Sequence, residues 1–357
     1  MIIKALQLSN FRNHTSAKFN FKKTTLIIGK NTAGKTNILE SLHILSHGKS
    51  FRAENDRDTI QDEKEFCRIE SLVENGSEKT RLAIIFANRN NYLSKKFLVN
   101  NVARRHLDFA ANFSSVLFTP EDIDLITGSP SLRRKYFDGI LSLASRDYRY
   151  ALGKYERGLR QRNRMLADIK HQRKYYKRED FEYWDKILID NAKVLTGKRE
   201  ELVDFVNESN KDLFDFHIIY DKSVMSLERL FKYHYEEQAA GVTLVGPQRD
   251  DYVFVFPLKR NDASNGASKK ISEFGSRGQE RLAILQMKLL EIAYLKKGTK
   301  ANPVLLLDDI FSELDEANIN KVFSYISGQQ TIITTTHHEF VPKKMMKQED
   351  LEIIELK

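Results

Sequence analysis

Hydrophobic positions open the chain in short runs that predict alternating strands and a helix. Residues 2–8 and 18–21 have the alternation of short strands, and the continuous apolar run at residues 24–29 is typical of a buried strand. Over residues 35–45 the apolar positions recur every three or four residues, which is helical spacing. The N-terminal pattern therefore predicts a strand, a tight loop and a helix in succession.

Strand-like runs continue along the chain and are interrupted by one long helical region. A capping residue followed by proline at Thr119-Pro120 and again at Ser129-Pro130 predicts two helix starts. A further helix is expected after Ser276. The strands expected after the first helix lie at 67–74, 80–87, 95–101, 114–118, 241–247, 251–257, 303–309, 331–336 and 351–356.

The helical region contains two seams of apolar residues at three-and-four spacing. We expect two antiparallel helices to pack along these seams, with the polar residues 170–180 at their junction. Strands before and after this region predict a sheet domain with an inserted helical lobe. The expected parts are 1–118, 119–240 and 241–357. The seam residues are Leu141, Tyr148, Leu152, Tyr155 and Leu159 in one helix, and Trp184, Leu188, Leu195, Leu202 and Phe205 in the other.

Composition indicates a soluble, cytoplasmic protein. The chain is 41% hydrophobic and 30% charged, has no apolar run as long as a membrane span, and begins without the layout of a signal peptide. Its single cysteine, Cys67, excludes an internal disulfide. The composition therefore argues against a membrane protein and against a disulfide-stabilised secreted domain.

Positive charge is concentrated in the helical region. The formal net charge is +9, but residues 133–178 alone carry +11, from 15 basic and 4 acidic residues, so the remainder is about −2. Tyrosines are interleaved with these cations. The segment is either a solvated helical face or a surface that binds a polyanion such as DNA. The DNA-contacting candidates are Arg160, Arg162 and Arg164.

Residues 29–36, GKNTAGKT, match the phosphate-binding pattern G-x-x-x-x-G-K-[ST]. The match follows a buried strand and opens a helix, the context in which backbone N–H groups point at phosphate oxygens. Lys35 is expected to reach the β and γ phosphates of ATP, and the Thr36 hydroxyl to bind Mg²⁺. An ordinary glycine-rich turn is the alternative. The nucleotide-binding candidates here are Gly29, Lys30, Asn31, Thr32, Ala33, Gly34, Lys35, Thr36 and Asn37.

A second apolar strand, PVLLLDD, ends in two adjacent carboxylates. Parallel strands deliver such residues to the edge of the sheet where ligands bind. Asp308 is expected to hold Mg²⁺ and Asp309 to polarise the attacking water. His337 and His338 follow the next strand. Either one of them senses the γ-phosphate, or both face solvent. With the phosphate loop, these carboxylates predict nucleoside triphosphate hydrolysis.

The order of these motifs resembles that of ABC-type ATPase heads. In those heads a Ser-Gly-Gly-Gln signature precedes the carboxylate strand; SRGQ matches it at Ser276, Gly278 and Gln279, with Arg277 in place of a glycine. By itself SRGQ is also an ordinary helix N-cap. The resemblance further places Ser312 and Asp315 in the Ser-x-Leu-Asp motif and His337 at the switch histidine.

Blocks spread over nearly the whole chain are similar to the RecF family: LSNFRNH, GKSFRAENDRDTIQ, TPEDIDLITGSPSLRRKYFD, YERGLRQRNRML and VGPQRDDYVF. The resemblance implies an α/β fold, a P-loop ABC-type ATPase head with a mixed sheet, flanking helices and an inserted basic helical lobe. It assigns Arg12 to the nucleotide, and Gln61 is the candidate link from γ-phosphate to the lobe. It also makes Asp309 the catalytic base, although many ABC-type heads have glutamate there.

The same resemblance implies the activity and the partners. We expect an ATP- and Mg²⁺-dependent homodimer on DNA with a weak, DNA-stimulated ATPase, which acts with RecO and RecR to help RecA load at single-strand gaps. A transporter nucleotide-binding subunit shares the motif order, but its helical lobe docks membrane subunits rather than a polyanion. An SMC-type head needs a longer coiled-coil arm than residues 119–240 allow, and a metabolic P-loop kinase leaves the signature unexplained.

Overall fold

A computed structural model describes residues 1–89, 92–257, 268–299, 302–310, 318–319, 328–336, 339, 341, 346 and 350–356 of the chain. It divides into two compact units. The first, here called the head unit, comprises Met1–Asp122 and Leu285–Lys357. The second, here called the lobe unit, comprises Ile123–Ile284. The predicted insertion at 119–240 begins close to the first residue of the lobe unit, Ile123, but ends well before its last residue, Ile284.

One layer of the head unit is an antiparallel sheet with the strand order β2-β1-β4-β5-β6-β7. Buried and exposed positions alternate along β4, because one face of the sheet packs on the core and the other faces outward. The strands are β1 (Ile2–Phe11), β2 (His14–Asn20), β4 (Phe66–Asn75), β5 (Glu78–Arg89), β6 (Tyr92–Val99) and β7 (Val102–Arg104).

The other sheet of the head unit is parallel, with the order β13-β3-β12-β11-β8. All four residues of β11 are buried, which explains its continuous apolar sequence. Since β12 pairs with both β3 and β11 in parallel, the carboxyl ends of these three strands meet at one edge. The strands are β3 (Thr24–Gly29), β8 (Ser115–Phe118), β11 (Val304–Leu307), β12 (Thr331–Thr335) and β13 (Leu351–Leu356).

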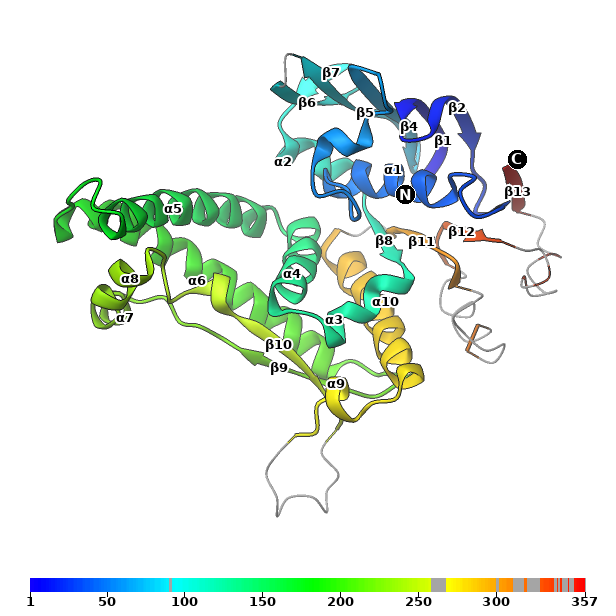
Figure 1. Cartoon of the computed structure of the whole chain (residues 1–357). Coiled ribbons are helices and arrows are strands. Elements are labelled where there is room, and N and C mark those ends of the chain that lie inside the picture. Colours follow the sequence, from blue (N-terminus) through cyan, green and yellow to red (C-terminus); the bar gives the residue numbers. More distant parts are fainter. Residues whose placement is uncertain are drawn as a thin grey trace. The chain divides into compact units, whose positions relative to one another are not determined.

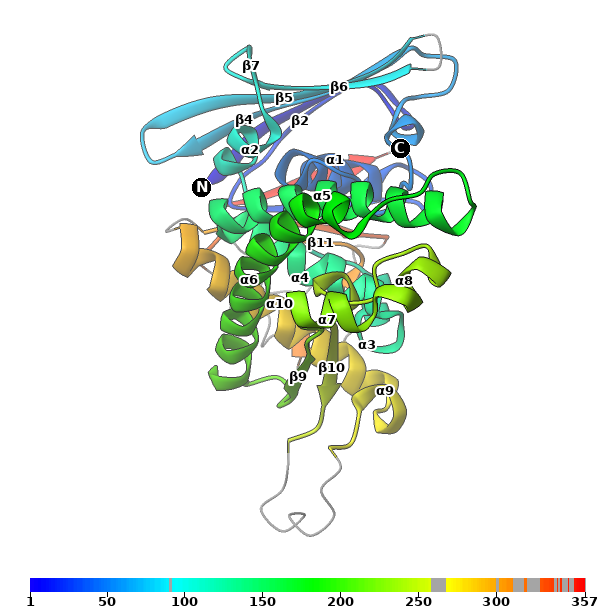
Figure 2. The ribbon, with the colours of Figure 1, turned by 90° about the vertical axis from the view of Figure 1, so that its left-hand side faces the viewer.

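Helix α1 (Lys35–His47) lies between the two sheets (Figure 2). Its apolar residues Ile38 and Leu42 share one core with Ile69 of β4 and Leu306 of β11. The start of α1 is thereby fixed against the edge where the parallel strands end. Short helical turns complete the unit at η1 (Asp56–Thr59), α2 (His106–Phe109), η2 (Ala110–Asn112) and η3 (Pro120–Ile123).

The lobe unit is built on two long antiparallel helices, α5 (Arg146–Lys170) and α6 (Arg178–Glu208), which are coloured green in Figure 1. Its other elements are α3 (Asp124–Thr127), α4 (Pro130–Ala144), β9 (His217–Asp221), α7 (Leu227–Lys232), α8 (His234–Ala240), η4 (Pro247–Arg249), β10 (Asp251–Val255), α9 (Ile271–Phe274) and α10 (Arg277–Thr299). The division between the units falls within α10. Among the described residues, the helices include none with the length and apolarity that crossing a membrane requires.

Buried ion pairs join the elements of the lobe unit. Arg199 of α6 donates hydrogen bonds to Asp138 of α4 at 2.7 Å and to Asp250, before β10, at 2.7 Å. Its side chain is 2% exposed. A charge so far from water is tolerated because each guanidinium edge has a carboxylate or carbonyl partner. This network fixes α4, α6 and the β9–β10 ribbon to one another.

The fold class is confirmed, and so are the two helical seams, because Tyr148, Tyr155, Leu188, Leu195 and Leu202 are all buried. Three of the strand expectations differ. The strands expected in one mixed sheet form two separate sheets. Residues 251–257, expected in the head, supply β10, which pairs with β9 in the lobe unit. Residues 241–247 form no strand, and the periodicity gave no sign of β7 or β9.

Candidate nucleotide-binding site

The loop between β3 and α1 has a backbone that requires glycine at two positions. Gly34 has φ 94°, and a Cβ added to it would lie 2.7 Å from the Asn13 side chain. A Cβ on Gly29 would lie 2.9 Å from the carbonyl oxygen of Leu356 in β13. Gly34 is also the N-cap of α1, where no side-chain cap is present among the described contacts. The first N–H groups of α1 therefore face the loop as an anion site.

The Lys35 ammonium is held at the mouth of this loop. Its Nζ donates hydrogen bonds to the carbonyl oxygens of Gly29 at 2.6 Å and Lys30 at 3.0 Å. Burial lowers the pKa of Lys35, while the charges of Asp309 and Asp308 act in the opposite direction. A cation that is partly desolvated and bonded to loop carbonyls is well placed to bind a phosphate.

Thr36, Asp308 and Thr334 form a compact cluster at the edge where β3, β12 and β11 end. The Thr36 hydroxyl donates to the Asp308 carboxylate at 2.9 and 3.2 Å, and the Thr334 hydroxyl donates to it at 2.5 Å. Burial raises the pKa of Asp308; the nearby charges of Glu121 and Asp309 add to this, and the two threonine hydrogen bonds oppose it. The carboxylate is thus costly to keep ionised until a cation is bound beside it.

Asp309 lies next to this cluster in a strained backbone conformation. Its φ is 47°, in the left-handed region, and its N–H donates to the Thr334 hydroxyl at 3.1 Å. The left-handed turn directs the chain away from β11 directly after Asp308. The two adjacent carboxylates therefore leave β11 in different directions at the sheet edge.

Asn13 and His14 also border the loop, and the sequence patterns did not single them out. The Asn37 amide donates to Asn13 Oδ1 at 2.9 Å, and His14 Nε2 lies 3.4 Å from the Gly34 carbonyl oxygen. Burial lowers the pKa of His14, while its contact with Gly34 raises it. Both residues belong to the FRNH stretch, where only Arg12 was selected because it matched a known nucleotide contact.

Arg12 and Gln61 lie in contacts of their own within the head unit. Arg12 binds the Glu40 carboxylate of α1 through two nitrogens, at 2.6 and 3.0 Å, and the Asp58 carbonyl oxygen at 2.7 Å. Gln61 exchanges hydrogen bonds with the Thr15 hydroxyl at 3.0 and 3.1 Å. These bonds connect β1 and β2 to α1 and η1. A nucleotide contact by either residue remains a prediction.

The signature stretch opens α10. Ser276 and Gln279 cap the helix reciprocally: Gln279 N donates to Ser276 Oγ at 3.3 Å, and Ser276 N donates to Gln279 Oε1 at 2.9 Å. Ser276 is exposed, and a Cβ on Gly278 would have only Ser276 Oγ near it, at 3.9 Å. The helix start is therefore open to a ligand. His337, His338, Ser312 and Asp315 lie outside the described residues.

Of the three DNA-contacting candidates, the structure contradicts one. Arg160 and Arg164 are exposed on α5, but Arg162 is 1% exposed. It binds Asp185 of α6 at 2.8 Å and Glu237 of α8 at 2.7 Å. Arg162 cannot reach DNA because it lies on the buried face of α5. Its spacing of two residues from each neighbour places it on the opposite side of the helix.

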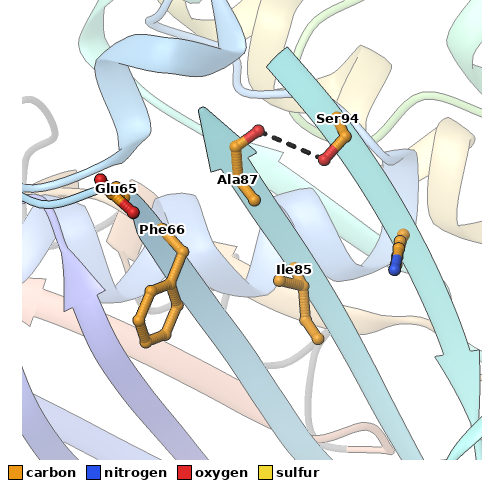
Figure 3. A pocket seen from close by; sticks show the side chains of 6 residues that line it. Glu65, Phe66, Ile85, Ala87 and Ser94 are labelled. Carbon is orange, nitrogen blue, oxygen red and sulfur yellow. Dashed lines mark hydrogen bonds between the residues drawn. The ribbon is translucent and has the colours of Figure 1, made fainter. Parts of the chain in front are cut away.

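A hollow of about 270 Å³ lies apart from the phosphate loop, on the outward face of the antiparallel sheet (Figure 3). Strand register brings Phe66, Ala87 and Ser94 side by side across β4, β5 and β6. Phe66 is 46% exposed there. The lining residues are Glu65, Phe66, Ile85, Ala87, Ser94 and Lys96. None of them belongs to the phosphate loop or to the cluster around Asp308.

Comparisons with known proteins agree with this geometry. The family model RecF/RecN/SMC N terminal domain matches residues 2–353. The chain is 31% identical to the DNA replication and repair protein RecF of Bacillus cereus (strain G9842), over 97% of this chain and 95% of that protein. It is 30% identical to the protein of the same name in Bacillus anthracis (strain CDC 684 / NRRL 3495), over 98% and 95%.

Solved structures give the same result. The recombination mediator protein RecF-ATP in the RecFOR pathway superposes with a TM-score of 0.84 and 29% identity, covering 95% of this chain and 93% of that one. The RecF-ATPrS structure of the same pathway gives 0.84 and 28%, covering 96% and 94%. Fold and sequence therefore resemble the same group of proteins over nearly the full length.

Proposed function

The chain belongs to the RecF family, and from this premise we propose that it is an ATP-dependent DNA-binding protein of recombinational DNA repair. The observation that carries the proposal is the joining of Thr36 and Asp308 beside Lys35 at one edge of the parallel sheet. The solved RecF-ATP structure supports ATP as the nucleotide. The relatives named as replication and repair proteins support the DNA role.

The residues of this site have separate roles in the proposed ATPase. The N–H groups at the start of α1 bind phosphate oxygens, and the Lys35 ammonium neutralises the β and γ phosphates. Thr36 and Asp308 supply oxygen ligands of the kind that Mg²⁺ prefers, already held 2.9 Å apart. Mg²⁺ would withdraw charge from the phosphates as the bond to the γ-phosphate breaks. Asp309 orients and polarises the attacking water.

We expect hydrolysis to need two copies of the chain. In this proposal the exposed helix start at Ser276 meets the γ-phosphate held by the partner, so that a two-fold dimer contains two composite sites. Gly278 leaves space for that phosphate, since only Ser276 Oγ lies within 4 Å of the position of its absent Cβ. His337 is the proposed γ-phosphate sensor. Hydrolysis then separates the subunits, and a slow rate keeps the dimer on DNA.

The exposed cations of α5 are the proposed DNA contacts. Arg160 and Arg164 lie on one exposed face, and Arg157 lies on the same face one turn earlier. We propose that the dimer, acting in the cytoplasm, binds duplex DNA through this face, acts at single-strand gaps, and works with RecO and RecR to assist RecA loading. An ABC transporter subunit remains the alternative with the same motifs, and an SMC-type structural head is the third. Neither requires exposed cations along α5.

DNA binding in three nucleotide states tests this function. Affinity for duplex, single-stranded and gapped DNA is measured with ATP, with ADP and without nucleotide, and ATP hydrolysis is measured with and without DNA. We expect ATP to increase DNA affinity and DNA to accelerate hydrolysis. Absence of DNA binding in every nucleotide state would overturn the proposal. A rate of ATP hydrolysis that is the same with and without DNA would favour the transporter alternative.

A further inference from the structure

The lobe unit ends in a surface where the loop 171–177 between α5 and α6 meets α7 and α8 (Figures 1 and 2). Lys170 Nζ donates to the Ala240 carbonyl oxygen at 3.1 Å, and the Arg178 guanidinium lies 4.5 Å from the centre of the Phe231 ring. These contacts join segments that are 70 and 53 positions apart in sequence. We call this surface the aromatic end, defined by Tyr175, Tyr176, Phe231, Tyr233 and Tyr235.

Three large aromatic rings of the aromatic end face solvent. Tyr175 is 81% exposed, Tyr235 is 80% exposed and Phe231 is 60% exposed. Burying one aromatic side chain removes 150–250 Å² from water in typical cases, so leaving three exposed costs a fold a large stabilising contribution. Because the segments that carry these exposed rings contact each other through Lys170 and Arg178, they form a candidate binding surface.

Cations lie close to other rings of the aromatic end. Residues 170–178 contain five Lys and Arg residues and no Asp or Glu. Lys174 Nζ lies 4.6 Å from the centre of the Tyr176 ring, and Lys232 Nζ lies 5.7 Å from that of Tyr233. Among the nearby carboxylates, Asp180 accepts from Lys177 N at 2.7 Å as a helix cap. The loop side of the aromatic end is thus basic, whereas α7 and α8 also carry exposed carboxylates at Glu228 and Glu236.

The rings stand on a rigid base. Phe181, 1% exposed, contacts Tyr176 and His234 edge to face, with ring centres 6.2 and 6.4 Å apart. The Arg162 guanidinium lies 5.4 Å from the centre of the Phe181 ring and is itself fixed by its buried carboxylate partners. A preorganised surface loses little conformational entropy when a ligand binds.

We propose that the aromatic end binds the unpaired bases of single-stranded DNA, an inference that rests on the DNA-binding function proposed above. Unpaired bases expose their flat faces and stack on aromatic rings and guanidinium planes, whereas bases within a duplex are already stacked on one another. The surrounding Lys and Arg side chains contact the phosphates of the same strand. The cations along α5 and the aromatic end would then recognise duplex and single strand respectively, as a gap presents both.

Binding to three labelled oligonucleotides tests the inference: a single-stranded dT 20-mer, an abasic 20-mer and a duplex 20-mer. The variant is the triple substitution Tyr175→Leu, Phe231→Leu and Tyr235→Leu, which keeps apolar bulk and every charge. The control is Tyr150→Leu, because Tyr150 on α5 is 52% exposed and Lys154 lies 4.4 Å from its ring centre. It is roughly 30 Å along the helix from Lys170.

We expect the triple variant to bind the dT 20-mer about tenfold or more weakly, with duplex binding and thermal melting unchanged, and the control to bind like wild type. In wild type, the abasic 20-mer should bind weakly by a similar factor, which tests the inference even if the triple variant does not fold. Equal affinity of wild type for dT and abasic strands would overturn it, as would unchanged dT binding by a folded triple variant or an equal loss in the control. Wild type that binds no DNA would overturn the proposed function as well.

Discussion

The Thr36 hydroxyl donates its one proton to the Asp308 carboxylate, with its oxygen 2.9 and 3.2 Å from the two carboxylate oxygens, although 272 positions separate the two residues in sequence. The parallel sheet produces this contact, because β12 lies between β3 and β11 and aligns their carboxyl ends. Thr334, at the end of β12, donates to the same carboxylate. The ends of three neighbouring strands therefore meet at Asp308. Substitutions of the residues around it should have different effects.

Lys35→Ala should abolish ATP hydrolysis and ATP-induced dimerisation together. The side chain donates only to loop carbonyls in the described contacts, so its loss should leave the fold intact while the γ-phosphate loses its main cation. Light scattering with and without ATP measures dimerisation, and circular dichroism melting checks the fold. A folded Lys35→Ala protein that still dimerises with ATP would remove this residue from the phosphate site.

Asp309→Asn should have the opposite effect on the dimer. Asn is a poor base, so hydrolysis should fall by about 10²–10⁴-fold, but Asp308 remains to hold Mg²⁺ and ATP still binds. The dimer should therefore accumulate with ATP and persist. Light scattering and nucleotide binding are measured on the same samples as for Lys35→Ala. A monomeric Asp309→Asn protein that binds ATP normally would contradict the assignment of Asp309 as the base.

Substitution of Arg160 and Arg164 should weaken DNA binding, whereas substitution of Arg162 should destabilise the fold. The pair Arg160→Ala and Arg164→Ala should leave stability within about 0.5 kcal/mol. On duplex DNA, log affinity falls linearly with log salt concentration. The magnitude of this negative slope should be smaller by about two in the double variant. Arg162→Ala should instead cost about 3–5 kcal/mol of unfolding free energy, because Glu237 is left buried without its cation and Asp185 keeps only Arg178 among the described ion pairs.

Salt titrations of duplex binding and urea denaturation measure the two effects. An unchanged slope in the Arg160→Ala, Arg164→Ala pair would show that this face of α5 does not contact DNA. A normally stable Arg162→Ala protein would contradict the buried ion-pair network.

Cys67 should report on opening of the head unit. It is fully buried in the core, and burial raises the pKa of its thiol to about 11, a shift that its contact with Thr59 opposes. In the unfolded chain the pKa of the thiol is about 9.0. The native state therefore holds its proton more tightly, and this contribution to stability is present below pH 9 and is lost as pH rises toward 11.

Labelling of Cys67 with a disulfide reagent at pH 8 should accordingly be slow in the native protein and fast in urea. MgATP at 100 times its Kd should slow native labelling by about 100-fold if the thiol reacts only after the head unit unfolds. The Lys35→Ala variant should show no such protection. Rapid labelling of the native protein would contradict burial of this cysteine.

The sequence predicted the parts of the site that depend on local pattern. GKNTAGKT identified a loop whose Gly34 has a positive φ, and the apolar run before Asp308 identified a buried parallel strand. It could not predict which arginine of RQRNR is buried, since that depends on which face of α5 packs against α6 and α8. Asn13 and His14 were missed because their contacts with the loop are tertiary.

Strand pairing was the other limit. Residues 251–255 read as an ordinary strand, and nothing in their alternation says whether the partner is a head strand or β9. Asp250 and Asp251, at the start of this strand, connect it to helices of the lobe unit. Arg199 binds Asp250 and Arg133 binds Asp251 at 2.7 Å each, and these long-range ion pairs hold β10 in the lobe unit. Such pairs between distant residues are invisible to a periodicity argument.

The last prediction concerns Ser276, whose exposed position at the start of α10 is consistent with a local cap and with a contact to a partner's phosphate. Ser276→Arg should leave ATP binding by the monomer unchanged but block dimerisation and hydrolysis, because the larger cationic side chain occupies the space beside Gly278. ATP binding by equilibrium titration and light scattering with ATP measure these effects. A Ser276→Arg protein that dimerises and hydrolyses ATP normally would limit this residue to its capping bond with Gln279.

Mixing Lys35→Ala with Ser276→Arg distinguishes the two roles. If Ser276 acts on the partner's nucleotide, both defects of a mixed dimer fall in one composite site and the other site is intact. Equal mixing should then restore roughly a quarter of wild-type activity when the sites fire independently, and less when they are coupled. If Ser276 only caps its own helix, every chain is defective and mixing restores nothing. Tagged co-purification with ATP shows that mixed dimers form. Because the restored activity can arise only from an intact site shared by two chains, its appearance would establish that the helix start of one subunit completes the phosphate site of the other.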